Sequence, residues 1–310
     1  MGKKPKEEKT YPFVSVIVPV YNDESNLKNC LDALENQTYP ENCYEVIVVD
    51  NDSDQSLNGL VNGFRNTVLA KQKNPGSYAA RNKGIHISKG EVIAFTDSDC
   101  IPFSDWIENG VTELMNTDNC GLLSGRIDLY FKSKKSMTAV EVYEKVNAFL
   151  QKDRIEKYNF GVTANLFTHK AVIDKVGIFN SKLKSAGDIE WGKRVHASGY
   201  KQIYSSNTSV LHPARNSFRQ IFKKTKRVVG GIYDLNEEKN YVFRDIVKDL
   251  KNLFGSILGL IKRFILGLPP SEKFMGAKQK MQYLIVYMFI GTVKIYEKLR
   301  LSRGAYSTRA

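Results

Sequence analysis

The chain has 310 residues, of which 42% are hydrophobic and 25% are charged, a composition that excludes a disordered chain and supplies a core for one large domain with an appendage. The formal net charge of +13 is unevenly spread. Residues 1–214 hold 26 basic and 26 acidic side chains, whereas residues 215–310 hold 20 basic and 7 acidic ones. Such an excess is typical of a region that meets phosphate groups, in lipid headgroups or in nucleic acid.

The first residues and the cysteines indicate the cellular context. Residues 1–10 lack the apolar stretch of a secretion signal, and Lys6 stands where N-myristoylation needs Ser or Thr. We therefore expect a flexible N-terminus and a cytoplasmic location. The cysteines show neither zinc-site spacing nor a disulfide pattern, which favours buried free thiols. They are Cys30, Cys43, Cys100 and Cys120.

Strands and helices alternate over the first part of the chain. The β-branched run at 13–19 predicts a strand, and apolar residues then recur at helical spacing between Leu27 and Leu34. The same alternation predicts strands at 45–49, 67–71 and 91–96, and helices at 57–64, 77–88 and 104–115. It indicates an α/β fold in which a mostly parallel, Rossmann-like sheet is flanked by helices.

The pattern is looser farther along the chain. We expect strands near 121–130, 162–167 and 203–211, and helices near 138–150, 169–176 and 189–198. From residue 215 the chain turns into basic helical segments, which include 253–268 and 281–299, separated by Pro269-Pro270. The sequence thus predicts a domain at 11–214 followed by a basic, amphipathic helical region at 215–310.

Polar side chains follow the predicted strands, where ligands bind in a doubly wound sheet. Asp97 and Asp99 flank Ser98 after the strand at 91–96, and two close carboxylates favour a hard cation such as Mg²⁺ or Mn²⁺ with a substrate phosphate. Taken alone, the two aspartates also suit a loop or a helix cap. The glycine-rich fingerprints of dinucleotide-binding dehydrogenases and of P-loop enzymes do not occur.

Six motifs together resemble the family 2 glycosyltransferases of the GT-A fold, and the match runs in order over about 200 residues. They are VSVIVPVYN (14–22), EVIVVDNDSD (45–54), NPGSYAARNKG (74–84), VIAFTDSDC (92–100), VGIFNSKL (176–183) and GDIEWGKRVHASGY (187–200). The resemblance implies an inverting transfer of a sugar from a nucleotide-sugar donor to an acceptor hydroxyl, assisted by Mn²⁺ or Mg²⁺. It also implies a nucleotide-binding half at 11–100 and an acceptor half at 101–214, with cell-surface polysaccharide or glycoconjugate synthesis as the setting.

The resemblance also implies roles for individual residues. Pro19 and Tyr21 would flank the nucleobase, Asp50 would hydrogen-bond it, and Asn74, Arg81 and Asp97 would complete the donor site. The residue chemistry agrees, because a carboxylate can accept from the imino N–H of uracil and a guanidinium can pair with diphosphate oxygens. We therefore favour a UDP-sugar, although Arg81 also suits a surface helix. Asn51 departs from the family pattern, which often has a second aspartate there.

Two further residues complete the candidate site. Asp188 is the expected general base, which would take the proton of the acceptor hydroxyl. It departs from the family pattern in that Gly187 replaces an acidic neighbour, and it also suits the N-cap of the helix at 189–198. Glu190 is the alternative base. His212 stands where some relatives supply a further ligand for the diphosphate or for the metal, which Asp97 and Asp99 would also bind, or it is an ordinary strand-end histidine.

The basic region leaves two interpretations open. Its longest uncharged apolar run, from Met281 to Val293, has 13 residues, fewer than the roughly 20 that a membrane-spanning helix needs. An amphipathic helix on an anionic membrane, at the inner face of the plasma membrane, fits its charge. The alternative is packing on the catalytic domain or on a second subunit, as in an oligomer.

Other functions are also considered. We expect a glycan or lipid-linked acceptor and no nucleic acid, since a neutral domain with two carboxylates after a strand does not suit a nucleic-acid-binding module. A catalytically degenerate GT-A protein and a nucleotidyltransferase remain alternatives. The sugar, the acceptor and the linkage have no readable code in the sequence.

Overall fold

The computed structural model describes residues 10–133, 136–236 and 276–308, and between the last two ranges residues 245–248, 250, 251, 254, 255, 258 and 259. Most of the helical segment predicted at 253–268 and of the N-terminus at 1–10 lies outside these residues. Contacts between residues divide the chain into two compact units. The first comprises Met1–Ile127, Gln151–Ile178 and Gly192–Val210, and the second Asp128–Leu150, Phe179–Trp191 and Leu211–Ala310.

Eight strands of the described chain form one sheet in the order β3-β2-β1-β4-β7-β6-β8-β5. Strands β1 to β4 pair in parallel, and β7 runs antiparallel to both β4 and β6. The strands are β1 (Val14–Val20), β2 (Tyr44–Asp50), β3 (Thr67–Lys71), β4 (Val92–Thr96), β5 (Ile101–Pro102), β6 (Cys120–Tyr130), β7 (Asn165–His169) and β8 (Lys201–Pro213). The predicted α/β class is confirmed.

The central strands are buried along their whole length, as expected for parallel strands that have both faces covered. Helix α1 (Glu24–Glu35) buries the face predicted from its apolar spacing. Helix α3 (Ser77–Ile87) lies close against β1 because Gly84 has no side chain, and a Cβ there would come within 2.5 Å of the Ile17 side chain. Helix α4 (Trp106–Met115) buries Trp106, whose indole Nε1 donates to Asn165 Oδ1 at 2.9 Å.

Most predicted elements lie within a few residues of their expected positions, including α7 (Lys170–Val176) and α8 (Gly187–Ala197). The helix expected at 57–64 is shorter, since α2 spans only Asn58–Val61. Helix α6 (Gln151–Tyr158) was not expected, because its sequence QKDRIEKY contains only two buried residues. The two-residue strand β5 and the 3₁₀ turn η1 (Glu41–Cys43) are too short for a periodic signal.

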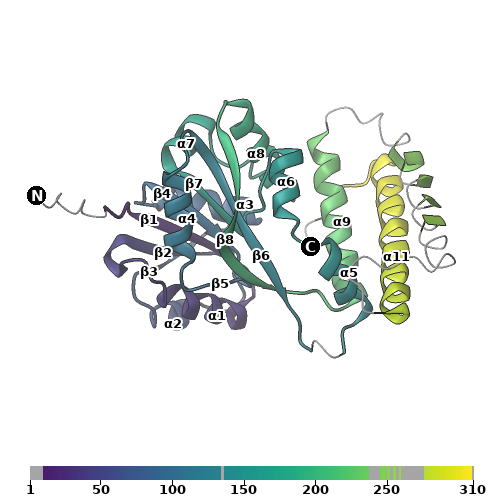
Figure 1. The fold of residues 1–310 in the computed structure, drawn as a ribbon, viewed down its shortest axis with the longest axis horizontal. Coiled ribbons are helices and arrows are strands. Elements are labelled where there is room, and N and C mark those ends of the chain that lie inside the picture. The colour runs from purple at the N-terminus through teal and green to yellow at the C-terminus, as the bar shows by residue number, and fades with distance from the viewer. Residues whose placement is uncertain are drawn as a thin grey trace, which may run out of the picture. The chain divides into compact units, whose positions relative to one another are not determined.

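The second unit is helical. Helices α9 (Phe218–Leu235) and α11 (Ala277–Ser302) lie side by side, and α11 also packs on α5 (Ala139–Asn147) (Figure 1). Their shared core contains Val140, Ile221, Val286 and Ile290. No helix among the described residues is long and apolar enough to cross a membrane.

Two glutamates lie buried among these helices, and each is paired with cations. Glu144 contacts Lys224 Nζ at 2.8 Å and Arg215 Nη1 at 3.0 Å. Burial by itself would raise the pKa of Glu144, but the charges and hydrogen bonds of Lys224 and Arg215 outweigh it and lower the pKa below its ordinary value. Glu297 is fully buried and pairs with Arg300 at 2.6 Å. The second unit therefore depends on charge pairs as well as on apolar packing.

All four cysteines are free thiols, and three of them are buried: Cys30, Cys100 and Cys120. The interpretation of the cysteines as buried free thiols is confirmed for these three, whereas Cys43 is half-buried in η1. Burial raises the pKa of the Cys120 thiol to about 11. It also raises the pKa of Cys100 well above its ordinary value.

Candidate functional site

The carboxyl ends of the parallel strands meet at one edge of the sheet. Val20 of β1 pairs with Asp50 of β2, which in turn pairs with Lys71 of β3. Tyr21, Asp50 and Asn74 therefore lie at or just beyond this edge, and the turn that holds Asp97 follows β4 there. The edge brings together the residues predicted for the donor site, as ligand-binding crevices of α/β sheets require.

The loops after β1 and β2 are joined by side-chain amide contacts. Asn22 adopts a left-handed backbone conformation with φ of 50°. Its Nδ2 donates to Asp54 Oδ2 and its Oδ1 accepts from the Asp54 backbone N–H, both at 2.9 Å. Pro19 is buried in β1, whereas the Tyr21 ring is 60% exposed. The joined loops line a hollow of about 310 Å³ whose walls include Asn22 and Asp54, and the exposed Tyr21 immediately precedes Asn22 in the chain.

Asp50 and Asn51 organise the end of β2. The Asp50 carboxyl is 2% exposed, and its Oδ1 accepts from the backbone N–H of Ser53 at 2.9 Å. The Asn51 amide donates to the carbonyls of Gln72 and Asn74, each at 2.8 Å, and its Oδ1 accepts from Gly76 N–H at 2.6 Å. An aspartate at position 51 would turn a carboxylate toward two carbonyl oxygens. Asn51 thus fixes the loop that carries Asn74, a role that the sequence did not reveal.

Arg81 lies in α3 and is buried, with 3% exposure, so it is not a surface cation. Its Nη2 donates to Asp97 Oδ1 at 2.5 Å, and its guanidinium lies 5.7 Å from the centre of the Tyr78 ring. In the part of the chain that the structure describes, Nε of Arg81 has no hydrogen-bond partner. Arg81 therefore holds Asp97 in place, with its guanidinium enclosed by the protein.

Asp97, Ser98 and Asp99 form a turn, because β4 already ends at Thr96. The carboxylates of Asp97 and Asp99 therefore project from a turn and not from alternate positions of a strand. Ser98 Oγ donates to Asp23 Oδ2 at 3.2 Å.

The pKa of a nearby thiol, Cys30, indicates the negative charge of this turn. Burial raises the pKa of Cys30, and the charges of Asp99, Asp97 and Asp23 raise it further. Three carboxylates thus concentrate negative charge at this edge, which favours a bound cation.

Asp188 belongs to the second unit. Helix α8 begins at Gly187, so Asp188 lies in its first turn, and the interpretation of Asp188 as an N-cap is wrong. Asp188 Oδ1 accepts from Ile189 N–H at 3.0 Å, while the carbonyl of Ala186 accepts from Glu190 N–H at 3.1 Å. The side chain is partly exposed. A carboxylate in the first turn of a helix interacts favourably with the helix dipole.

His212 also belongs to the second unit, near the end of β8. It is buried, its ring lies 4.5 Å from the Phe149 ring, and its Nδ1 is 2.8 Å from the carbonyl oxygen of Pro213. A carbonyl only accepts hydrogen bonds, so Nδ1 is the donor in this contact. In a neutral ring Nε2 would then carry the lone pair, and a histidine can bind a metal through that nitrogen.

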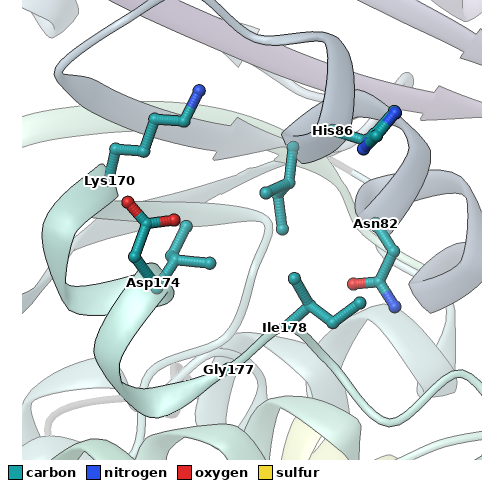
Figure 2. A pocket seen from close by; sticks show the side chains of 8 residues that line it. Asn82, His86, Lys170, Asp174, Gly177 and Ile178 are labelled. Carbon is teal, nitrogen blue, oxygen red and sulfur yellow. The ribbon is translucent and has the colours of Figure 1, made fainter.

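A larger hollow of the first unit lies away from these residues. Asn82 and His86 of α3 line one side of a hollow of about 460 Å³, and Lys170 and Asp174 of α7 line the other side (Figure 2). Val92, the first residue of β4, pairs with His169, so Lys170 lies at the edge of the sheet opposite to Asp97. The Lys170 ammonium donates to the carbonyl of Ser88 at 2.7 Å. Size alone therefore does not decide where a ligand binds, and the residues predicted for the donor site lie at the other edge of the sheet, the carboxyl edge.

Known proteins resemble this chain in sequence and in fold. The family model described as Glycosyl transferase family 2 matches residues 15–177. Glycosyltransferase AglE of Haloferax volcanii is 39% identical over 227 residues, which cover 72% of this chain and 73% of that protein. The poly(ribitol-phosphate) beta-N-acetylglucosaminyltransferase TarP of Staphylococcus aureus is 32% identical over 186 residues, or 56% of this chain and 54% of that protein.

Among solved structures, the mannosyltransferase PcManGT of Pyrobaculum calidifontis, in complex with GDP-Man and Mn²⁺, aligns with a TM-score of 0.61. The alignment covers 93% of this chain and 88% of that one at 17% identity. At this identity the likeness shows the fold alone.

Proposed function

The chain belongs to glycosyl transferase family 2, and from this premise we propose that it transfers a sugar from a UDP-sugar to an acceptor hydroxyl with inversion of the anomeric carbon. It is a glycosyltransferase with the GT-A fold. The acceptor that we propose is a glycan or a lipid-linked molecule in polysaccharide or glycoconjugate synthesis. The observation that carries the proposal is the gathering of Tyr21, Asp50 and the Arg81–Asp97 pair at one edge of the sheet.

The donor would bind along this edge. The exposed Tyr21 ring, with Pro19 beside it, offers an apolar face to the nucleobase. Asp50 Oδ1 is engaged by Ser53, so Oδ2 is the atom that we propose for the imino N–H of uracil. Asn74 stands on the loop held by Asn51, where it would approach the ribose. Arg81, which pairs with Asp97 at this edge, would supply positive charge to the diphosphate.

The carboxylates of the turn after β4 suit a divalent cation. Asp97 and Asp99 provide oxygen ligands, and His212 is proposed as a third ligand on the chemistry of its Nε2. A set of carboxylates and one imidazole favours Mn²⁺, although Mg²⁺ remains compatible with the oxygen ligands. When bound, such an ion neutralises the charge that develops on the departing diphosphate.

Asp188 is the residue that we propose as the general base. Its place in the first turn of α8 favours the carboxylate form at neutral pH, and its partial exposure leaves room for an acceptor hydroxyl. The proton of the attacking hydroxyl would pass to an Asp188 oxygen while the bond between the anomeric carbon and the diphosphate breaks. A single displacement of this kind converts an α-linked donor into a β-linked product.

A donor screen tests the proposal. Purified protein with Mn²⁺ is supplied with UDP-glucose, UDP-galactose, UDP-N-acetylglucosamine and GDP-mannose, and nucleotide release is measured with and without glycan acceptors. We expect release from a UDP-sugar and a β-configured product in proton NMR. Release from GDP-mannose alone would overturn the assignment of uridine, and an α-configured product would overturn inversion. Absence of release from every donor would favour a degenerate family member.

We further propose that the second unit docks on an anionic membrane. Five exposed apolar side chains form a stripe along α11, opposite its buried face, and we call them the α11 stripe: Met281, Ile285, Met288, Tyr296 and Leu299. Lys278 and Lys294 are exposed on the same helix. The positive charge of residues 215–310 complements anionic headgroups, and each basic residue near such a surface contributes about 1 kcal/mol.

Vesicle sedimentation tests this docking. Protein should sediment with phosphatidylglycerol vesicles at low salt, less so at high salt, and weakly with phosphatidylcholine. Replacing Ile285 and Met288 with Ser should reduce binding, whereas the control Met115→Ser, which changes an exposed residue at the end of α4, should not. Equal binding to both vesicle types would overturn the electrostatic account. Self-association that is lost in the Ile285/Met288 variant, without vesicle binding, would assign the stripe to a second copy of the chain.

A further inference from the structure

The segment that leads into the proposed base has an unfavourable backbone conformation. Ala186, two residues before Asp188, is buried and has φ of 63°, in the left-handed region that favours glycine. Its carbonyl accepts the hydrogen bond from Glu190 that closes the first turn of α8. An alanine keeps this conformation only where its surroundings enforce it. The contacts around residues 184–186 therefore determine how Asp188 enters the helix.

Helix α9 packs closely against this segment at a glycine, Gly231, which has no side chain. A Cβ on Gly231 would lie 2.6 Å from the Cβ of Ser185 and 2.7 Å from its carbonyl carbon. Glycine in the interior of a helix is less favourable than alanine. Gly231 stands within α9 nonetheless, because any larger residue would push the backbone of Ser185 away.

The chain after α11 holds the same segment from another side. It turns at Gly304, where φ is 87°, and runs to Ser307, which is buried. Lys184 Nζ donates to the carbonyl of Ser307 at 2.5 Å, and Ser307 Oγ donates to Asp234 Oδ2 of α9 at 2.6 Å. A Cβ on Gly230 would lie 2.9 Å from the Ser307 Cβ. Three parts of the second unit thus converge: residues 184–186, α9 and residues 304–307.

We propose that Gly231, Lys184 and Ser307 are positioning residues that fix the entry of the chain into α8 and so hold Asp188 in its working orientation. This inference rests on the proposed role of Asp188. The segment 304–307 and the Gly230–Gly231 pair together form a clamp, and the Lys184–Ser307 hydrogen bond closes it. Loosening the clamp would leave the donor edge of the first unit untouched and would misplace the base.

Two variants with matched controls test the clamp. Lys184→Met removes the donor to Ser307, and its control is Lys182→Met, which changes an exposed lysine two residues earlier. Gly231→Ala forces the contact with Ser185, and its control is Gly59→Ala, where a Cβ in helix α2 meets nothing within 4 Å. Hydrogen exchange of the amides at 183–190 should be faster in both variants and unchanged in both controls.

Kinetics then show whether the clamp acts through the base. Misplacing a catalytic group by about 1 Å costs on the order of a hundredfold in rate, so kcat should fall about tenfold or more while the donor KM stays within about twofold. In the Asp188→Asn background, Lys184→Met should have no further effect on kcat, because residues that act as a unit are not additive.

The outcomes are distinguishable. Unchanged hydrogen exchange in both variants, or faster exchange with unchanged kcat, would overturn the clamp. A multiplicative loss in the double variant would also overturn it, since Lys184 would then act independently of Asp188. If Asp188→Asn alone left kcat intact, the proposed base would be wrong, and the exchange data would still decide whether the segment is held. If Gly231→Ala fails to fold, Lys184→Met still tests the proposal.

Discussion

In the first unit, the strands β1, β2 and β4 are buried along their whole length, and the polar residues of the site follow where these strands end. In the second unit, α5 and α11 bury Glu144 and Glu297 among apolar side chains and pair them with cations. Apolar packing therefore carries the strands of the first unit, whose buried Arg81 pairs with Asp97 at the edge, and we expect changes in the exposed part of that edge to leave the fold intact. In the second unit charge pairs are part of the core, so stability and function are coupled there.

The largest expected effect is loss of the cation at the edge of the first unit. Asp99→Ala, or excess chelator, should lower activity by about a thousandfold or more, because the charge on the leaving diphosphate would no longer be neutralised. The thermal midpoint should shift by less than about 2 °C, since Asp99 lies in a turn outside the core. Asp105→Ala, an exposed aspartate six positions on, is the control. Full activity in chelator would contradict metal dependence.

Breaking a charge pair of the second unit should act on stability instead. Glu144→Gln leaves Lys224 and Arg215 without their carboxylate, and we expect a loss of about 3 kcal/mol in the free energy of unfolding, measured with urea. Glu156→Gln, which touches only an exposed i,i+4 pair with Lys152, should cost less than about 1 kcal/mol.

The same variant has a pH signature. The pKa of Glu144 is lowered by folding, so its contribution is fully present above the ordinary carboxyl pKa of about 4.5. That contribution is lost as the pH falls through the folded pKa. The stability difference between the native chain and Glu144→Gln should therefore shrink in acid. A difference that stayed constant with pH would show that Glu144 is not ionised in the fold.

Asp188→Asn should lower kcat by about a hundredfold while donor affinity stays nearly the same, because the amide keeps the shape and removes the basicity. The loss of one charge in the first turn of α8 should cost less than about 1 kcal/mol of stability. Single-turnover kinetics on the folded fraction would measure the expected fall in the rate of transfer. Lost stability with kcat per folded molecule intact would make Asp188 structural and Glu190 the next residue to test.

The smallest effect is expected at Asn51. Asn51→Asp places a carboxylate against the carbonyls of Gln72 and Asn74, so the loop at 72–76 should shift and the donor KM should rise about tenfold. The value of kcat should change little, because Asp97 and Arg81 keep their contact. Asn58→Asp on the exposed start of α2 is the control. An unchanged donor KM would show that this loop does not contribute to donor binding.

The sequence predicts the first unit better than the second for a physical reason. Buried parallel strands are continuous apolar runs, and the residues that end them fall at one edge of the sheet, so the positions of Asp50 and Asp97 follow from the pattern. The role of Asn51 depends on three backbone groups of a distant loop, which no local pattern encodes. The contact between Gly231 and Ser185 likewise joins two segments far apart in the chain.

Element boundaries show the same limit. The helix expected at 189–198 begins two residues earlier, at Gly187, because the buried, left-handed Ala186 starts its first turn. The spacing of apolar residues does not predict the polar helix α6, because this helix buries only Gln151 and Ile155. Local propensity identifies the elements, and tertiary contacts determine where they begin and end.

The uneven burial of the cysteines gives the chain a natural site for chemical labelling. Burial raises the pKa of Cys30, Cys100 and Cys120, so these thiols hold little reactive thiolate at neutral pH. Cys43 is half-buried in η1, at the amino end of β2. A maleimide fluorophore should therefore attach first to Cys43, roughly 20 Å along the strand from Asp50. It would report on donor binding by fluorescence without an engineered cysteine and without touching the donor edge.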